Sequence, residues 1–354
     1  LGEEYRWNIP SLTYGFDESF VNYYGARGMA EVDKAMQILQ SVPPVSQMSS
    51  GLSEYPLNTR RINYQARALF LWDIKSTALS SVLNGLGLGS PERYTWTLRE
   101  HINLALPDTP EENMVIQRNF DPVTWQPSSY VNSVLYTYVV LQTYATPEVW
   151  EAVEVEVDPT VPSVTSVAAF SGTAGGTVLA SGSGLAFGPG SFYNGLTRDD
   201  VGGLRYLYRA ENMNVETVIS NAVAAQPGAG DGIIGSGSGH NPWIAPGGGT
   251  NTVAVTNLVS VAVRQGIEKV NFIRVDYNGL LGIWTPLTNV WTDTYLTNGV
   301  WEEQAAQRVL NQPDILFSAA DLYPADYGQA ASFQNNDPLN GWQTLYGPGQ
   351  IQPP

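Results

Sequence analysis

Apolar residues recur at helical spacing in four segments of the chain, and each segment predicts a helix with one buried face. The most strongly patterned segment runs from Asn63 to Leu86, with Asn58-Thr59 as its start signal and a Gly-rich exit. Its predicted buried positions are Leu71, Ile74, Ala78, Leu79, Val82, Leu83 and Leu86. The other three predicted helices are Gly28 to Gln40, Leu196 to Tyr208 with Thr197 as N-cap, and Val300 to Leu310 after Thr297-Asn298-Gly299.

Other segments alternate apolar and polar residues or are rich in Val, Tyr, Thr and Trp, which predicts strands. Glu151 to Val157 has the signature of a half-buried strand. Asn278-Gly279 predicts a hairpin turn between two further strands. The remaining strands are expected at Leu12 to Phe16, Val164 to Phe170, Val253 to Val263, Val270 to Tyr277 and Val290 to Leu296.

These elements together predict an α+β fold of two parts. Residues 1–210 form the first part and carry a β-rich insertion at about 92–190. Residues 211–354 form a smaller β-rich C-terminal part. The Gly-rich segment at about 226–250 is the expected linker, although a long structural loop is equally consistent with its composition.

The C-terminal end of the helix predicted from Asn63 to Leu86 has a residue spacing that bears on metal chemistry. Residues 80–90 read SSVLNGLGLGS. They resemble the H-E-x-x-H-x-x-G-x-x-H helix of the zinc metalloproteases called metzincins, and LGLG resembles the matrixin, or matrix-metalloproteinase, branch. In this frame the glycine is kept as Gly87, whereas Ser80, Asn84 and Ser90 stand where the family has its three zinc-binding His residues, and Ser81 stands where it has Glu.

Two other stretches extend the resemblance in the order that the family shows. Leu12 to Leu39, LTYGFDESFVNYYGARGMAEVDKAMQIL, is similar to the matrixin opening strand and helix. Leu196 to Tyr208, LTRDDVGGLRYLY, is similar to the closing helix. The resemblance implies a metzincin-like core without its zinc ligands, and similar stretches in large secreted bacterial proteins imply no activity. The segment between Ser90 and Leu196 is much longer than in the family.

Zinc hydrolysis requires ligands that this motif lacks. A catalytic zinc takes three protein ligands, mostly His, and a general base. Ser and Asn are poor zinc ligands, and Ser81 cannot act as the base. The chain has only two His residues, His101 and His240, far apart in sequence, for which surface or loop roles are expected. We therefore assign no catalytic, cofactor-binding or metal-binding residue and expect a protein that is not an enzyme.

Other hydrolytic and binding chemistry leaves fewer signals. No G-x-S-x-G elbow is present, and the Gly-Ser run beside His240 has the wrong spacing. Glycoside hydrolysis needs only two carboxylates, so it stays open. The acids considered for it are Glu151, Glu154 and Glu156 along one strand and Asp199 and Asp200 at a helix start. Phosphate-binding loops and EF-hand loops are absent, although loop Asp and Asn groups can still bind Ca²⁺.

Composition restricts the partners. The 354 residues carry 17 Lys and Arg against 33 Asp and Glu, a net charge of −16, which disfavours nucleic acid and anionic membranes. No apolar run is long enough to span a membrane. Charged residues make up only 14%, while 10 Trp and 19 Tyr suit contact with protein or sugar. The chain has no Cys, and it begins with Leu1 rather than Met, so either a leader has been removed or the sequence begins late.

These observations favour a non-enzymatic extracellular or cell-surface protein that assembles with itself into a filament, sheath or surface layer. The low charge, the abundant uncharged polar and aromatic residues and the erased zinc motif support this hypothesis. A carbohydrate- or surface-binding adhesin is the alternative, since aromatic rings stack on sugars. A glycosidase or peptidase is the third hypothesis. The expected partner is a second copy of the chain, with glycans as the alternative.

Overall fold

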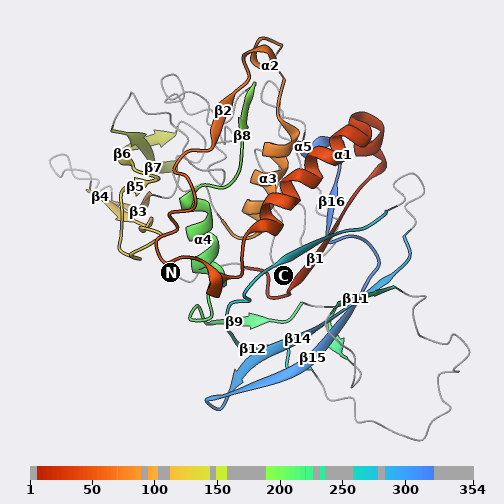
Figure 1. The fold of residues 1–354 in the computed structure, drawn as a ribbon. Coiled ribbons are helices and arrows are strands. Elements are labelled where there is room, and N and C mark those ends of the chain that lie inside the picture. The colour runs from red at the N-terminus through yellow and green to blue at the C-terminus, as the bar shows by residue number, and fades with distance from the viewer. Residues whose placement is uncertain are drawn as a thin grey trace, which may run out of the picture.

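The computed structural model describes residues 6–69, 71–88, 95–102, 112–143, 149–157, 189–219, 221–225, 232–235, 258–277 and 284–322. The protein has an α+β fold (Figure 1). Its helices are α1 (Glu18–Ser41), α2 (Tyr64–Ala68), α3 (Ile74–Gly85), α4 (Arg198–Tyr208) and α5 (Ala319–Leu322), with a 3₁₀ turn at Val45–Gln47. None of these helices combines the length and the apolar character that crossing a membrane requires.

The strands form several small sheets and one larger sheet. The first eight are β1 (Ser11–Phe16), β2 (Arg60–Ile62), β3 (Trp96–Ile102), β4 (Glu112–Gln117), β5 (Tyr130–Val131), β6 (Val134–Thr143), β7 (Val149–Glu156) and β8 (Ser191–Tyr193). The remaining strands are β9 (Asn214–Thr217), β10 (Val223–Ala224), β11 (Gly232–Gly235), β12 (Val261–Arg264), β13 (Asn271–Arg274), β14 (Leu287–Thr297), β15 (Val300–Leu310) and β16 (Ile315–Phe317).

Strand β1 lies at the centre of a three-stranded parallel sheet of order β13-β1-β16. Leu12 pairs with Phe272 on one side, and Phe16 pairs with Phe317 on the other. Both partners come from the last quarter of the described chain. The predicted boundary near residue 210 therefore runs through a shared sheet. It also runs through a shared hydrophobic core, because one cluster of buried residues extends from Trp7 to Leu322.

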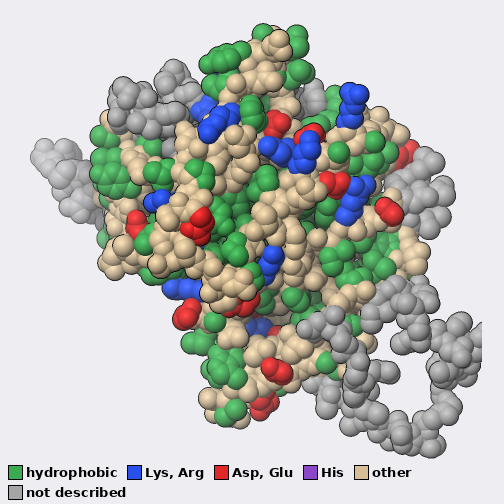
Figure 2. Space-filling view, in the orientation of Figure 1, with side chains coloured by type: hydrophobic (Ala, Val, Ile, Leu, Met, Phe, Trp, Pro, Cys, Tyr) green, Lys and Arg blue, Asp and Glu red, His purple; other side chains and the backbone are tan. Residues whose placement is uncertain are grey.

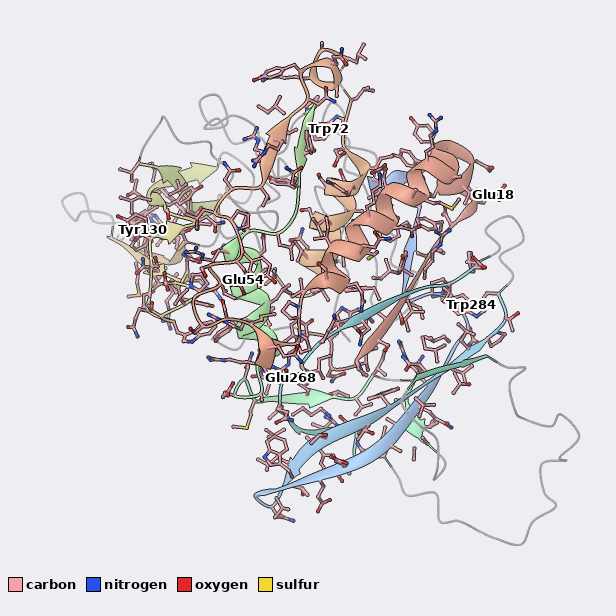
Figure 3. The ribbon with its side chains drawn as sticks, viewed as in Figure 1. Glu18, Glu54, Trp72, Tyr130, Glu268 and Trp284 are labelled. Carbon is pink, nitrogen blue, oxygen red and sulfur yellow. The ribbon has the colours of Figure 1, made fainter. Side chains whose placement is uncertain are left out.

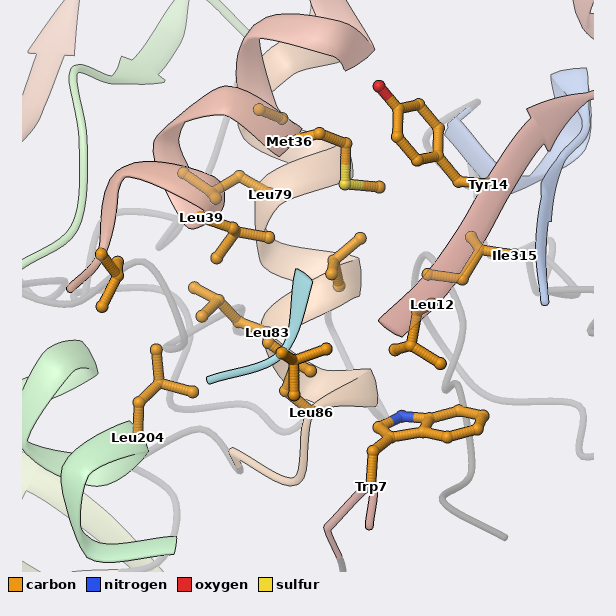
Figure 4. Close-up of a cluster of buried hydrophobic side chains, with 14 of the residues drawn as sticks. Trp7, Leu12, Tyr14, Met36, Leu39, Leu79, Leu83, Leu86, Leu204 and Ile315 are labelled. Carbon is orange, nitrogen blue, oxygen red and sulfur yellow. The ribbon is translucent and has the colours of Figure 1, made fainter. Parts of the chain in front are cut away.

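Helix α1 begins earlier than the sequence pattern indicates. Asp17 caps it by accepting a hydrogen bond from the Phe20 N–H at 2.9 Å, ten residues before the predicted start. Gly25 has a positive φ of 61° inside the helix and marks a kink. The predicted buried positions Val32, Met36 and Leu39 lie in the core, where they meet α3 and β1 (Figure 4).

The long helix predicted from Asn63 to Leu86 is two helices. Asn63 caps α2 and Asp73 caps α3, so the predicted start signal at Asn58-Thr59 is wrong. The two caps are ten residues apart, and the chain leaves α2 at Leu69 before α3 begins at Ile74. Leu71 is consequently 52% exposed rather than buried, while Ala78, Leu79, Val82, Leu83 and Leu86 are buried as predicted.

The described part of the predicted insertion contains two antiparallel sheets, β3-β4 and β5-β6-β7. Asn132 and Ser133 both have positive φ and form the two-residue turn between β5 and β6. The Asn132 side chain donates to the Thr197 hydroxyl at 3.0 Å and accepts from the Asp199 N–H at 3.1 Å. This turn therefore attaches the insertion to the start of α4. The predicted strand at Val164 to Phe170 lies outside the described residues.

Strands β14 and β15 form the longest hairpin of the structure and belong to a six-stranded sheet of order β10-β15-β14-β12-β9, with β11 also paired to β14. The helix predicted from Val300 to Leu310 is wrong, since these residues are β15. Asn298 and Gly299 have φ angles of 49° and 77° and form a two-residue hairpin turn. Pairing along eleven positions of β14 overrides the helix propensity of Glu, Gln, Ala and Arg in β15.

A buried ion pair joins the parallel sheet to the hairpin. Arg308 of β15 donates two hydrogen bonds to the Asp314 carboxylate, at 2.7 and 2.9 Å, and both side chains are almost completely buried. The same carboxylate accepts from the Thr13 backbone N–H at 2.8 Å and from the Thr13 hydroxyl at 2.9 Å. Asp314 thus holds the edge of β1 and the end of β15 together.

Replacing Asp314 with Ala should lower the free energy of unfolding by about 3–5 kcal/mol, because Arg308 would stay buried without a counterion. Urea denaturation of the two proteins measures the difference. Glu31→Ala is the control, since the Glu31–Lys34 pair is exposed and its loss should cost at most about 0.5 kcal/mol. A loss below about 1 kcal/mol for Asp314→Ala would contradict the role given to this carboxylate.

Candidate functional site

The motif helix α3 is a core helix. Ser80 and Ser81, at the positions of the first His and the Glu of the metzincin motif, are completely buried, and Asn84 is partly exposed. Two side chains from other parts of the chain close the helix C-terminus. The Trp7 indole N–H donates to the Gly85 carbonyl at 3.0 Å, and the Tyr208 hydroxyl donates to the Leu86 carbonyl at 3.1 Å.

These motif positions offer no catalytic arrangement in the part of the chain that the structure describes. The Ser81 hydroxyl donates to the Thr77 carbonyl at 3.0 Å, one turn earlier, and the Ser80 hydroxyl has no hydrogen-bond partner among the described residues. No group of three or more His, Asp or Glu side chains among the described residues can hold a metal ion. Ser90 and His240 lie outside the described residues.

His101 lies in strand β3, not in a loop. Its ring stacks on Trp150 of β7 with centroids 3.9 Å apart. Its Nδ1 lies 2.7 Å from the Asn113 side-chain oxygen on the paired strand β4. The ring is half-buried, so His101 packs the two sheets of the insertion against each other.

The acids of β7 do not share one face, contrary to the interpretation from sequence. Glu154 pairs with Tyr138 and Glu151 with Leu141 in an unbroken register, and an odd separation of three residues places two strand positions on opposite faces. The Glu154 carboxylate accepts from the Trp96 backbone N–H at 3.1 Å. Glu156 has the same parity as Glu154, and the side chains of Glu151 and Glu156 lie outside the described structure.

Asp199 and Asp200 begin α4 and have different roles. The Asp200 carboxylate accepts from the Thr197 N–H at 2.6 Å and from its hydroxyl at 2.7 Å, which completes a capping box. Asp199 accepts no such bond. Burial, followed by the neighbouring Asp200 and Asp121 carboxylates, raises the pKa of Asp199 to about 7. This carboxyl group lies at the junction between the insertion and α4.

Aromatic and cationic side chains pack beside this junction. Trp125 lies in a tight loop and has a positive φ of 59°. The guanidinium groups of Arg205 and Arg209 lie 5.2 and 4.7 Å from the centre of its ring, and Tyr206 and Phe120 complete the cluster. Because these rings contact one another and two cations, the cluster is better explained by packing of the insertion on α4 than by stacking on a sugar.

The comparisons add no information about identity: no protein-family model, curated protein or solved structure matches the chain. The metzincin resemblance therefore stays a prediction from three sequence stretches. The function has to be argued from the geometry of the molecule itself.

The most unusual surface of the described structure is one face of the six-stranded sheet. Val215 of β9 pairs with Val263 of β12, which pairs with Leu296 of β14, which pairs with Trp301 of β15. Directly paired residues point to the same face. The four side chains therefore form a continuous apolar row across four strands, which we call the outward face.

The opposite face of this sheet packs on the rest of the protein. It carries Trp291 and Ala306, both buried, and the buried ion pair Arg264–Asp293, with hydrogen bonds of 2.8 and 2.9 Å. Because side chains alternate along a strand, the residues of the outward face point away from this inner set. Val215 is 73% exposed and Trp301 is 42% exposed. Three further exposed residues extend the same face, namely Val223, Val261 and Val309.

The outward face was not found from the sequence, because it depends on pairing between segments that are far apart. Residues 300–310 were interpreted as a helix, which places Trp301 in no sheet. Asn298-Gly299 is the available signal, since Asn-Gly between two strands is a hairpin signature. The predicted hairpin at 278–279 lies outside the described residues.

The motif serines give a test of the core interpretation. Ser80→Ala should leave the free energy of unfolding unchanged or raise it by about 1 kcal/mol, because it removes a buried hydroxyl without a partner. Ser81→Ala should lower it by about 1 kcal/mol, because it removes the bond to Thr77. Chemical denaturation under identical conditions compares the two. A large loss for Ser80→Ala would show that this hydroxyl has a role that the structure does not contain.

The raised pKa of Asp199 gives a second test. The folded state favours the protonated carboxyl, so its stabilising contribution is complete below about pH 4 and is lost as the pH rises through about 7. Asp199→Asn should remove this loss. Between pH 5 and pH 8 the free energy of unfolding of the variant should rise by on the order of 1 kcal/mol relative to wild type. This value is smaller than the shift in pKa alone would give, because the residue is partly exposed.

Denaturation curves at several pH values measure the gain, with Glu31→Gln as the control for removing one exposed acid. Parallel pH profiles for wild type and Asp199→Asn would contradict the assignment.

Proposed function

We propose that this protein is a non-enzymatic, extracellular structural protein that assembles with copies of itself through the outward face. The observation that carries the proposal is the row Val215, Val263, Leu296 and Trp301, which runs across four paired strands with its two end residues exposed and its two central residues partly exposed. Contiguous exposed apolar patches are characteristic of interaction sites. A second copy of the chain is the partner to which we assign this face.

Burial of this row favours association. Complete burial of a fully exposed Val, Leu or larger apolar side chain contributes about 1.5–3 kcal/mol. Val215 and Trp301 are 73% and 42% exposed, and Val223, Val261 and Val309 lie beside them, so their burial offsets part of the cost of lost translational and rotational freedom, which is about 4–15 kcal/mol. An aromatic anchor such as Trp301 is the residue type that most often dominates an interface.

The composition agrees with an assembly role outside the cell. Charged residues are only 14% of the chain, so uncharged polar and aromatic side chains are abundant, and the apolar contact has to overcome the repulsion between copies that each carry a net charge of −16. The helix with the metzincin-like spacing serves as core, so in this proposal the protein uses a protease-like scaffold without its chemistry. Filaments, sheaths and surface layers all require such a repeated contact. Glycan binding is the alternative partner class for the exposed aromatic side chains.

Replacing Val215 with Asp should abolish assembly, because it places a charge in the apolar row at its most exposed position. Light scattering and negative-stain electron microscopy of the purified proteins measure the effect. Val139→Asp is the matched control, since Val139 is also an exposed strand residue but belongs to the insertion. Circular dichroism melting curves verify that both variants are folded.

Regular polymers of wild type and of Val139→Asp, with monomers of Val215→Asp, are the expected result. A wild-type protein that stays monomeric at every concentration tested would overturn the proposal. A glycan array on the same sample would then decide for or against the adhesin alternative.

A further inference from the structure

Helix α2 and its flanking residues project from the molecule, and the described large apolar side chains between Ile62 and Leu71 are exposed, whereas Trp72 at the base packs against the core. The segment from Arg60 to Trp72, which we call the α2 projection, contains four large apolar residues that are more than one-third exposed: Ile62, Tyr64, Leu69 and Leu71. No residue of α2 is buried. Figure 3 labels Trp72, at the base of the projection, where the chain returns to α3.

Hydrogen bonds and a closely packed glycine hold the backbone of the α2 projection in place. The Asn63 side chain accepts from two N–H groups at the start of α2. Gly190 closes its base, because the Asn63 N–H donates to the Gly190 carbonyl and the Gly190 N–H donates to the Leu71 carbonyl, both at 2.7 Å. Gly190 has a φ of 75°, and a Cβ there would lie 2.5 Å from the Arg67 nitrogen. The apolar side chains are therefore held in solvent by a defined backbone.

The charges of the α2 projection and of the sheet are opposite in sign. Between Asn58 and Trp72 the chain carries Arg60, Arg61 and Arg67 and no acid. Arg61 and Arg67 are exposed. In the described strands of the six-stranded sheet and the hairpin turn, the exposed charged residues are Glu302 and Glu303, and the two basic residues, Arg264 and Arg308, are buried in ion pairs. Glu303 shares the outward face with Trp301, two residues away.

These two surfaces lie at opposite ends of the molecule. Figure 1 shows α2 at one end and the tip of the β14–β15 hairpin at the other. Figure 2 shows apolar side chains at the surface of both ends. Two different complementary surfaces on one chain produce a head-to-tail contact, which propagates into a filament unless the rotation between copies closes a ring.

We propose that the α2 projection of one copy docks on the outward face of the next copy. This inference rests on the proposed function and names its contact. The dimensions match, because a row across four strands is roughly 14 Å wide, and a helix with its side chains is about 10–12 Å in diameter. Tyr64 and Leu69 cover the apolar row, and Arg61 and Arg67 approach Glu303.

A symmetric contact of two outward faces fits less well. It would bring the exposed acids of two copies together without a basic residue between them, and like charges in contact oppose association. It would also leave the α2 projection without a partner. The head-to-tail contact buries both apolar surfaces and pairs their charges.

A mixing experiment separates the two arrangements. Leu69→Asp disables the α2 projection and keeps the outward face, whereas Val215→Asp disables the face and keeps the projection. Each variant alone should be monomeric in sedimentation velocity at concentrations at least tenfold above those at which wild type assembles. An equimolar mixture should form dimers and nothing larger, because one intact contact is available. Val139→Asp is the matched control and should assemble like wild type.

The outcomes distinguish this inference from the proposal on which it rests. If Leu69→Asp assembles like wild type while Val215→Asp does not, the outward face is the assembly surface but the α2 projection is not its partner. If wild type never assembles, both fail. A mixture that stays monomeric would also overturn the head-to-tail contact.

Charge reversal gives an independent readout. Arg67→Glu should weaken wild-type assembly at least tenfold at low salt, and mixing it with Glu303→Arg should restore heterotypic contacts. Both side chains are exposed, so neither change threatens folding. Absence of any rescue, with both variants folded by circular dichroism, would contradict the pairing of these two ends.

Discussion

The structure depends on the placement of β1 between β13 and β16. A parallel strand cannot find its neighbours through a tight turn, so both partners must come from distant parts of the chain. Here they come from residues 271–274 and 315–317. This arrangement fixes the six-stranded sheet against the helices, because the Asp314 carboxylate holds Thr13 of β1 and Arg308 of β15 at once. The distance and orientation between the two ends of the molecule follow from that contact.

The first two motif positions of α3 lie in the core of this protein and not at an accessible surface. In α3 the residues at the first two motif positions are completely buried, and the helix end is closed by Trp7 from the N-terminal segment and Tyr208 from α4. A hydroxyl buried in this way neither binds zinc nor reaches a substrate. The features that still call for a functional explanation are therefore on the surface, at the outward face and at the α2 projection.

The outward face and the α2 projection differ in the charges that they carry. Each exposes apolar residues that the fold does not cover, and their charges are of opposite sign although the whole chain carries a net charge of −16. Acidic residues outnumber basic ones by 33 to 17 in the chain, yet the α2 projection contains three Arg residues and no acid. A chain that meets its own copies head to tail requires such an asymmetry, whereas a monomer that binds a small ligand does not.

Local features of this fold follow from the sequence alone. The N-cap at Thr197, the strands β1 and β7 and most of the buried positions of α3 depend on residues a few positions apart, where propensity and hydrogen bonding act directly. The α+β class followed from these elements.

Pairing between different segments decides the rest of the fold. Residues 300–310 have a composition that favours helix, and they form β15 because β14 pairs with them over eleven positions. The parallel sheet joins β1 to strands near the C-terminal end of the described chain, and the outward face exists only because β9, β12, β14 and β15 pair in register. The free energy of such contacts belongs to pairs of segments, so no pattern within one segment records it.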